Sequence, residues 1–480
     1  MKELAKYLNE AIDKNRERLF ALSQQIWEYA EVGFQEYRSA EALKAFLIEE
    51  GFTVQSGVAG IPTAFVASYG SGKPSIGFLG EYDALYDLSQ EPGNPQRKAF
   101  QNGNAGHGCG HNDLGVGSLA AAVAVKDYMK EHGLAGSVSY FGCPAEEDGS
   151  GKMFMARAGV FDGLDGAFTW HPEEKNAVDG NSWLACIGVL YRYKGRATHA
   201  AGQPHLGRSA LDACELMNVG VNYLREHMIQ DARVHYAYRD AGGGAPNVVQ
   251  DHAAVYYFIR APKVSQAIEL RERVDNIARG AALMTETQLE IITTDGLCDF
   301  VPNHALSELL QEGLEAAGAP AFSKEDIQLA AKFQEGFDPA EVAAQIKYYA
   351  GKYGEEVAAE IAKSPLMDQV ILPLRFEPIV SPGSTDVGDV SYVCPTAQLF
   401  TSTFAIGTAG HSWQLTAMSG CNIGHEGMLT AGKAMAYAAV KAMQSPDVLK
   451  KAKEEYIKST GGSYICPVPA DVEPMLDGVK

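Results

Sequence analysis

The chain has 480 residues, which is too long for one small core, so two or three domains are expected. It carries 40 basic and 60 acidic residues, and the formal net charge of −20 argues against nucleic acid or an anionic membrane as a partner. Its eight cysteines lack the spacing of a disulfide framework. The N-terminal sequence has no apolar secretory segment, and no run of about 18 apolar residues predicts a membrane span, so we expect a cytoplasmic protein.

The first part of the chain alternates helical and extended patterns. The first 50 residues predict a long amphipathic helix and then a second helix near Ser39 to Glu50. Apolar runs typical of strands follow in FTVQSGV, TAFVASYG and SIGFLGEYDAL. DLGVGSLAAAVAVKDYMKEHGLAG predicts a helix that stops at Gly133, and SVSYFGCP predicts a strand that ends at Pro144. A further helix and the strand GAFTWHP follow, so we expect an α/β domain with a largely parallel sheet.

The pattern changes near Asn181. SWLACIGVLYRYKGRATHAA alternates in steps of two, as an antiparallel strand does, and two helices and further strands follow it. After Pro302 the chain is predicted to be helical to about Ser364, before the strand AQLFTSTFAIG and an Ala-rich helix. We therefore predict a mixed, mostly parallel α/β catalytic domain from residues 1–185 and 301–480, and an inserted α+β domain from residues 186–300.

The stretch GHGCGHN, residues 106–112, places a thiol and an imidazole between the strand GEYDAL and the next helix. Cys109 and His111 are separated by one glycine, and glycines let the backbone turn so that alternate side chains converge. Loops at the carboxyl ends of strands in an open α/β sheet are where ligand and metal sites lie. A thiolate and an imidazole suit zinc and related divalent ions.

Three further stretches place metal donors at strand ends. Glu146 and Glu147 follow a strand in CPAEEDGSG, His171 ends the next strand in FTWHPEE, and His411 follows the last strand in GTAGHSWQL. Together with the first cluster they are too many ligands for one tetrahedral zinc with an open position. They suit two ions that share a water molecule.

The adjacent pair Glu146 and Glu147 predicts two roles. Past Pro144 the chain can bend, so that one carboxylate ligates an ion while its neighbour faces the shared water. Hydrolysis needs such a second carboxylate to take the proton of the water and pass it to the leaving amine. We therefore assign Glu147 as a ligand and Glu146 as general base and acid. Each feature alone has an ordinary explanation, such as a solvated helix start for the two glutamates, so the joint placement carries the prediction.

These motifs, with GRATHAAGQPHLGRSALDA, NVVQD and GSTDVGDVS, resemble those of the co-catalytic metallo-amidohydrolases, the family of aminoacylases, hippurate hydrolases and indole-acetyl-amino-acid hydrolases. The resemblance extends over nearly the whole chain and implies two divalent ions, zinc or manganese. Their ligands fall on Cys109, His111, Glu147, His171 and His411. The catalytic carboxylate falls on Glu146. His425 ranks second to His411 as the last ligand, because His411 directly follows the last strand.

The same resemblance implies that the inserted domain is a lid and dimerisation domain. In relatives the histidine that matches His199, in THAA, reaches the active site of the other subunit and polarises the scissile carbonyl, and stabilising that oxyanion is a large catalytic term. Asn247 and Arg260 match the substrate-binding Asn and Arg of the family, and Arg260 offers a planar fork for a carboxylate. The chain has STDV at 384–387 where the family usually has SEDF, so it lacks the glutamate of that motif.

The sequence therefore predicts a metal-dependent amidohydrolase that cleaves the amide between an acyl or aroyl group and the nitrogen of a free amino acid. We expect a homodimer through the inserted domain, or pairing with a paralogous subunit. Three alternatives stay open: a dipeptidase of the same family acting on β-alanyl or basic dipeptides, a non-catalytic helper subunit, and an amidase whose nucleophile is Cys109 with a histidine base.

Overall fold

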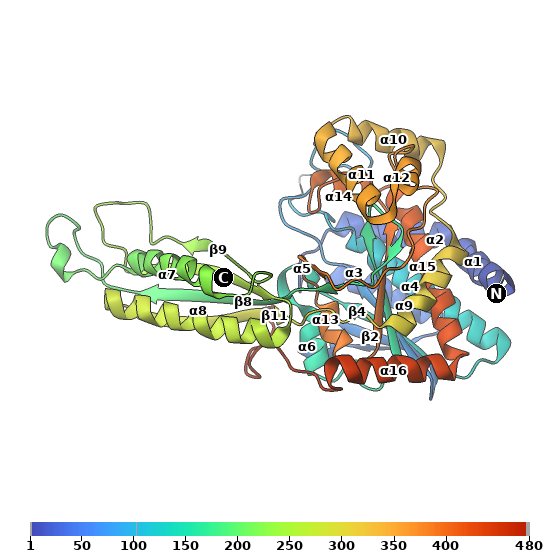
Figure 1. Cartoon of the computed structure of the whole chain (residues 1–480), viewed down its shortest axis with the longest axis horizontal. Helices are drawn as coiled ribbons and strands as arrows, with labels where there is room; N and C mark the ends of the chain where they lie inside the picture. The colour runs from blue at the N-terminus through green and yellow to red at the C-terminus, as the bar shows by residue number, and fades with distance from the viewer. Residues whose placement is uncertain (1, 102, 477–480) are drawn as a thin grey trace.

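Two sheets organise the fold. The computed structural model describes residues 2–101 and 103–476. Figure 1 shows a large α/β body from which an elongated arm extends. The mixed α/β architecture with an inserted arm was predicted and is confirmed, while the domain limits at residues 185 and 300 stay a prediction.

The body is built on a seven-stranded sheet with the order β1-β2-β4-β3-β5-β13-β6. Its strands are β1 (Thr53–Ser56), β2 (Phe65–Ser71), β3 (Ser75–Glu81), β4 (Gly136–Cys143), β5 (Gly166–Glu173), β6 (Ala177–Val178) and β13 (Thr396–Ser402). The central pairs β4–β3, β3–β5 and β5–β13 are parallel, and the outer pairs are antiparallel. The carboxyl ends of four central strands therefore meet at one edge of the sheet.

Helices cover both faces of this sheet. One face packs on α1 (Lys2–Lys14), α2 (Arg16–Tyr29), α3 (Tyr37–Glu49), α4 (His111–His132), α9 (His304–Ala317) and α15 (Asn422–Met443). The other face packs on α6 (Gly151–Arg157) and α13 (Val387–Ser391). The short α5 (Glu146–Gly149) follows β4, and α16 (Pro446–Thr460) packs beside α9.

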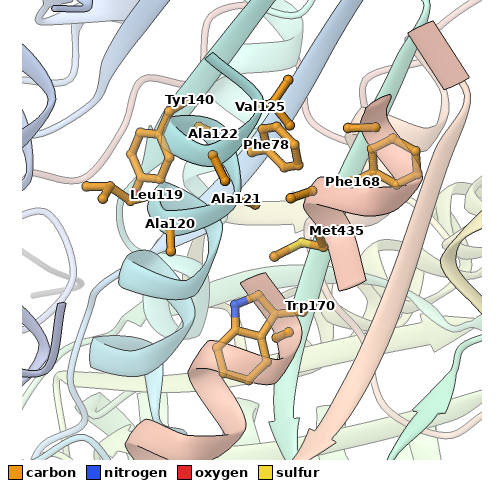
Figure 2. Packing of buried hydrophobic residues seen from close by; sticks show 14 of the residues in the cluster. Phe78, Leu119, Ala120, Ala121, Ala122, Val125, Tyr140, Phe168, Trp170 and Met435 are labelled. Carbon is orange, nitrogen blue, oxygen red and sulfur yellow. The ribbon is translucent and has the colours of Figure 1, made fainter. Parts of the chain in front are cut away.

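Trp170 anchors β5 in the main core. Figure 2 shows its ring with Phe78 and Phe168 of the sheet, near the small side chains of α4 and Met435 of α15. Its Nε1 donates to Leu114 O at 3.0 Å, and a Cβ on Gly117 would lie 2.7 Å from the same nitrogen. Because neighbouring residues of a strand point to opposite faces, burial of Trp170 directs His171 to the other face.

The N-terminal prediction of one long helix is wrong at Asn15. The structure has α1 and α2 separated by this residue, whose φ of −97° and ψ of 3° are not helical. The Asn15 side chain donates to Ala11 O at 3.2 Å. Asparagine side chains compete in this way with the hydrogen bonds of the helical backbone, and the break lets both helices bury apolar residues on α4 and α15.

The arm is a four-stranded antiparallel sheet with the order β11-β8-β10-β9. Its strands are β8 (Ala185–Lys194), β9 (Arg233–Asp240), β10 (His252–Ala261) and β11 (Gln288–Leu297), and its helices are α7 (Ala210–Leu224) and α8 (Val264–Thr285). Alternate residues of β8, from Ile187 to Tyr193, are buried in one core with both helices. The helices therefore cover one face of the arm's sheet.

A helical segment follows β11 and α9, as predicted for the residues after Pro302. It contains α10 (Lys324–Gln334), α11 (Pro339–Tyr353) and α12 (Glu355–Ile361). The remaining elements are β7 (Ser182–Trp183) paired with β12 (Val380–Ser381), α14 (Trp413–Ser419), and the 3-10 turns Val58–Gly60, Pro204–Leu206 and Arg225–His227. None of the helices within residues 2–101 and 103–476 has the length and apolar character needed to cross a membrane.

Candidate metal centre

The loop before α4 brings Cys109 and His111 to the carboxyl edge of the sheet. Gly110 has a φ of +76°, and a Cβ there would lie 2.9 Å from Pro172 Cγ, so glycine allows the loop to approach β5. The sequence predicted His111 to lie in the loop, whereas it is the first residue of α4 and is fully buried. Burial fixes the position of its ring.

Asp83, just after β3, orients His111. Its Oδ1 lies 2.8 Å from His111 Nδ1, and its Oδ2 accepts a hydrogen bond from the backbone N–H of Glu147 at 2.9 Å. A histidine whose Nδ1–H is bound by a carboxylate presents its Nε2 lone pair to a metal ion. His111 Nε2 is buried and has no hydrogen-bond partner.

The five predicted ligands come together in overlapping groups. Within the described residues, Cys109, His111 and His171 offer atoms within 4.8 Å of one another, and so do Cys109, Glu147 and His411. Cys109 Sγ lies 3.2 Å from His171 Nε2, and His411 Nε2 lies 3.3 Å from Glu147 Oε1. Because Cys109 belongs to both groups, it occupies the position of a bridging ligand. The contact with Glu147 raises the pKa of His411.

His425, the second choice for the last ligand, lies elsewhere. Its Nδ1 is 2.9 Å from Asp113 Oδ1, and its ring packs on Phe20 at 5.0 Å between centroids. It belongs to none of the ligand groups found among the described residues.

Glu81, the last residue of β3, is a carboxylate of this centre that the sequence analysis missed. Its Oε2 lies 3.3 Å from His111 Nε2 and has no hydrogen-bond partner, and Glu81, His111 and Glu146 form a third group within 4.8 Å. Its Oε1 accepts from Lys152 Nζ at 2.6 Å, and the same ammonium contacts Asp386 Oδ1 at 2.5 Å. Glu81 ends a strand, as the recognised donors do, and this signal was available in GEYDAL.

Glu146 begins α5, directly after β4. Burial and the neighbouring Glu81 carboxylate raise the pKa of Glu146 well above its ordinary value when no cation is bound. Ala145 before it has a φ of +56°, and its backbone N–H donates to the buried Glu36 at 2.8 Å. This turn separates the directions of Glu146 and Glu147, as their predicted roles require.

Arg260 lies where the arm joins the body. Its Nη1 donates to Ser384 Oγ at 2.6 Å, and its Nε is buried without a hydrogen-bond partner. Ser384 precedes Asp386, which binds Lys152, so the arm contacts the loop that ends at the metal centre. The STDV segment therefore uses its aspartate for an internal ion pair.

His199 and Asn247 lie at the opposite end of the arm and are both exposed. In the β8–β10 ladder Arg260 pairs with Cys186 near the body, whereas His252 pairs with Lys194 at the far end. His199 follows this far end and forms a β-bridge with Val248, and a strand of ten residues spans about 30 Å. A single chain thus does not bring these two residues to its own metal centre.

A cleft beside Glu147 separates the body from the arm. Its volume is about 310 Å³, and the body contributes Phe34, Tyr86 and Asp148. The arm contributes Arg239, Tyr256, Phe258 and Asp295. The arm residues were not predicted, because only the folded arrangement places them opposite the strand ends.

A thiol, imidazoles and carboxylates that converge at the strand ends, beside a cleft closed by an inserted arm, define a metal-dependent hydrolase. The chain belongs to peptidase family M20/M25/M40, whose sequence profile matches residues 77–412. The predicted resemblance to the metallo-amidohydrolases is confirmed, and membership in this family disfavours the alternative of a Cys109 nucleophile.

The chain is 43% identical over 477 residues to a protein of Escherichia coli that is named as one of the two subunits of p-aminobenzoyl-glutamate hydrolase, covering 99% of both chains. It is 29% identical over 466 residues to the Xaa-Arg dipeptidase of Mus musculus, covering 93% of this chain and 90% of the relative. The fold is similar to that of a dinuclear metal-binding M20 peptidase from Bacillus subtilis, with a TM-score of 0.57 and 18% identity over 90% of this chain and 99% of that structure.

Proposed function

We propose that this chain hydrolyses N-aroyl amino acids and that its substrate is p-aminobenzoyl-glutamate, cleaved to p-aminobenzoate and glutamate. The relative that is 43% identical over the full length is named for this reaction. The observation that best supports the chemistry is that buried, unpartnered atoms of Glu81, His111 and Glu147 lie among the groups of clustered donors. Unpaired buried polar atoms are costly, and a cation would satisfy them.

The proposed ligands of two divalent ions, zinc or manganese, are Cys109, His111, Glu147, His171 and His411. Bound ions of this kind supply Lewis-acid activation of water and of the scissile carbonyl. The mixed thiol, imidazole and carboxylate set fits them, since the soft sulfur suits zinc and the oxygens also suit manganese.

Glu146 is proposed to take the proton of the attacking water and to return it to the leaving nitrogen. Its burial favours the protonated form between these two steps, as a group that is first base and then acid requires. Arg260 is proposed to bind a carboxylate of the amino-acid part from its place at the arm–body junction. Its guanidinium is already directed toward the Ser384 loop.

His199 and Asn247 are proposed to serve the active site of a second chain, where His199 would hold the oxyanion. Their exposure and their distance from their own metal centre support this arrangement. The second chain is a copy of this one or a paralogous subunit, and the 43% identical relative is itself named as a subunit. A cytoplasmic location is part of the proposal, and the eight free thiols agree with it.

The test is an assay of the purified chain, supplied with zinc or manganese, on p-aminobenzoyl-glutamate, hippurate, acetylated amino acids and basic dipeptides. We expect p-aminobenzoyl-glutamate to be cleaved fastest. Glu146→Gln should lower turnover by about 10²–10⁴-fold with unchanged metal content, whereas the exposed Glu341→Gln should change neither.

The same assay separates the alternatives. Preferred cleavage of dipeptides with a basic residue would replace the proposal with the dipeptidase function, in line with the 29% identical relative. Activity that appears only after a paralogous subunit is added would support the helper-subunit alternative. Full turnover by Glu146→Gln would remove this residue from its role.

A further inference from the structure

A second pocket lies on the same face of the main sheet as the candidate ligand His171. Its volume is about 310 Å³, and it lies between α11, the β6–β7 segment and the loop before β12. Its wall residue Phe400 is the Cα partner of His171 on the neighbouring parallel strand. Paired residues of adjacent strands share a face, and adjacent strands lie about 4.8 Å apart, so this wall is one strand away from the metal centre.

Aromatic rings form most of the apolar lining. They belong to Trp183, Tyr348, Tyr349, Tyr353 and Phe400. The rings of Trp183 and Phe400 are 6.4 Å apart between centroids, and those of Tyr349 and Tyr353 are separated by the same distance. Aromatic rings at such distances provide edges and faces on which a further ring can pack.

Three cations line the same pocket. Lys175 Nζ lies 4.5 Å from the centroid of the Phe400 ring and 3.6 Å from Glu173, and Lys352 Nζ lies 3.0 Å from Glu377. Arg375 lies 5.3 Å from the centroid of the Tyr353 ring. Among the described residues Arg375 has no ion pair, so it is the cation of this pocket that can accept a new carboxylate.

The polar side of the pocket also has an unused group. Asp179 accepts hydrogen bonds from Trp183 Nε1 at 2.6 Å and from the backbone N–H of Asn181 at 3.1 Å, which fixes its carboxylate. Asn181 lines the pocket, and its Oδ1 is buried without a hydrogen-bond partner. A buried acceptor without a donor is costly, and a ligand that carries an N–H or O–H group would satisfy it.

We propose that this pocket binds a single-ring aromatic carboxylate. The ring packs among the aromatic side chains, and the carboxylate pairs with Arg375, whose planar fork matches its geometry. The volume lies at the lower end of the range for small-molecule sites, about 300–1,000 Å³, which favours one ring over a fused system. The site goes beyond the proposed reaction, and its occupancy does not require turnover.

The experiment is isothermal titration calorimetry of the full chain, stripped of metal by a chelator, with benzoate. Metal removal leaves no cation at the strand ends to bind the carboxylate, so the outcome is independent of the hydrolase function. We expect a 1:1 complex in which Arg375→Gln weakens affinity at least tenfold. The matched control Lys347→Gln, an exposed residue of α11, should leave the affinity unchanged.

A second variant tests the ring contacts. Tyr348 is 53% exposed, so Tyr348→Ala should fold normally and weaken benzoate binding several-fold. Neutral benzamide and inorganic phosphate should bind much more weakly than benzoate. Equal affinity for phosphate, equal affinity in Arg375→Gln, or no measurable binding of benzoate would each overturn the proposal.

Discussion

Asp83 joins His111 to Glu147. One of its oxygens lies 2.8 Å from His111 Nδ1, and the other accepts the backbone N–H of Glu147 at 2.9 Å. A single buried carboxylate therefore fixes the orientation of two of the proposed metal ligands, one from the loop before α4 and one from the loop after β4. This relationship couples two strand ends that are 64 residues apart in sequence.

Asp83→Asn is expected to weaken metal binding without unfolding the protein. Loss of a partner that orients a metal-ligating histidine costs about 10–100-fold in metal affinity. Competition with a chromophoric chelator measures this affinity. The nearby exposed Asp87→Asn is the control, and a metal affinity of Asp83→Asn equal to that of the wild type would exclude the orienting role.

Lys152→Met is expected to destabilise the fold strongly. The ammonium is fully buried and neutralises Glu81 and Asp386, so its removal leaves two buried carboxylates without a cation. Removing one partner of a buried ion pair costs about 3–5 kcal/mol. Urea unfolding of the metal-free protein measures the loss, and the exposed Lys130→Met should stay close to the wild type. An equal midpoint for both variants would contradict the assigned contacts.

His199→Ala and Glu146→Gln chains are each expected to be inactive alone and to recover activity when they are mixed. In a mixed dimer, one active site would combine Glu146 of the first variant with His199 of the second. If subunits exchange freely, about a quarter of the wild-type activity should return. Dimer exchange is followed by native mass spectrometry. Exchange without recovered activity would show that His199 does not act across subunits.

Asp389 makes stability depend on pH. Burial raises its pKa from 3.8 to about 7, although Tyr464 donates a hydrogen bond to it at 2.7 Å. Between these values the folded chain holds a proton that the unfolded chain has released, so the free energy of unfolding falls as pH rises from about 4 to about 7. Asp389→Asn should remove this contribution. Thermal unfolding across this range measures it, and an unchanged pH slope in the variant would contradict the assignment.

The strand-end rule predicted most of the candidate site from sequence. Cys109, His111, Glu147, His171 and His411 were chosen because each follows or ends a predicted strand, and the parallel order of β4, β3, β5 and β13 brings these ends to one edge. Their role as metal ligands stays a prediction. The choice of His411 over His425 used the same rule, and in the structure His425 contacts Asp113.

The features that were missed depend on contacts between distant segments. Lys152 follows a glycine-rich turn, and nothing in its neighbourhood indicates that its ammonium lies between Glu81 and Asp386, which are about 300 residues apart. The break at Asn15 was missed because the apolar periodicity continues through it. Arg239 reaches the cleft only through the placement of the arm relative to the body.

The most direct measurement of the central claim is the metal content of the purified chain by elemental analysis, for the wild type and for the single variants Cys109→Ser and His411→Ala. The account predicts two divalent ions per wild-type chain and a loss of about one ion in each variant, with secondary structure retained. Two tightly bound ions in both variants, or none in the wild type after incubation with zinc or manganese, would contradict it.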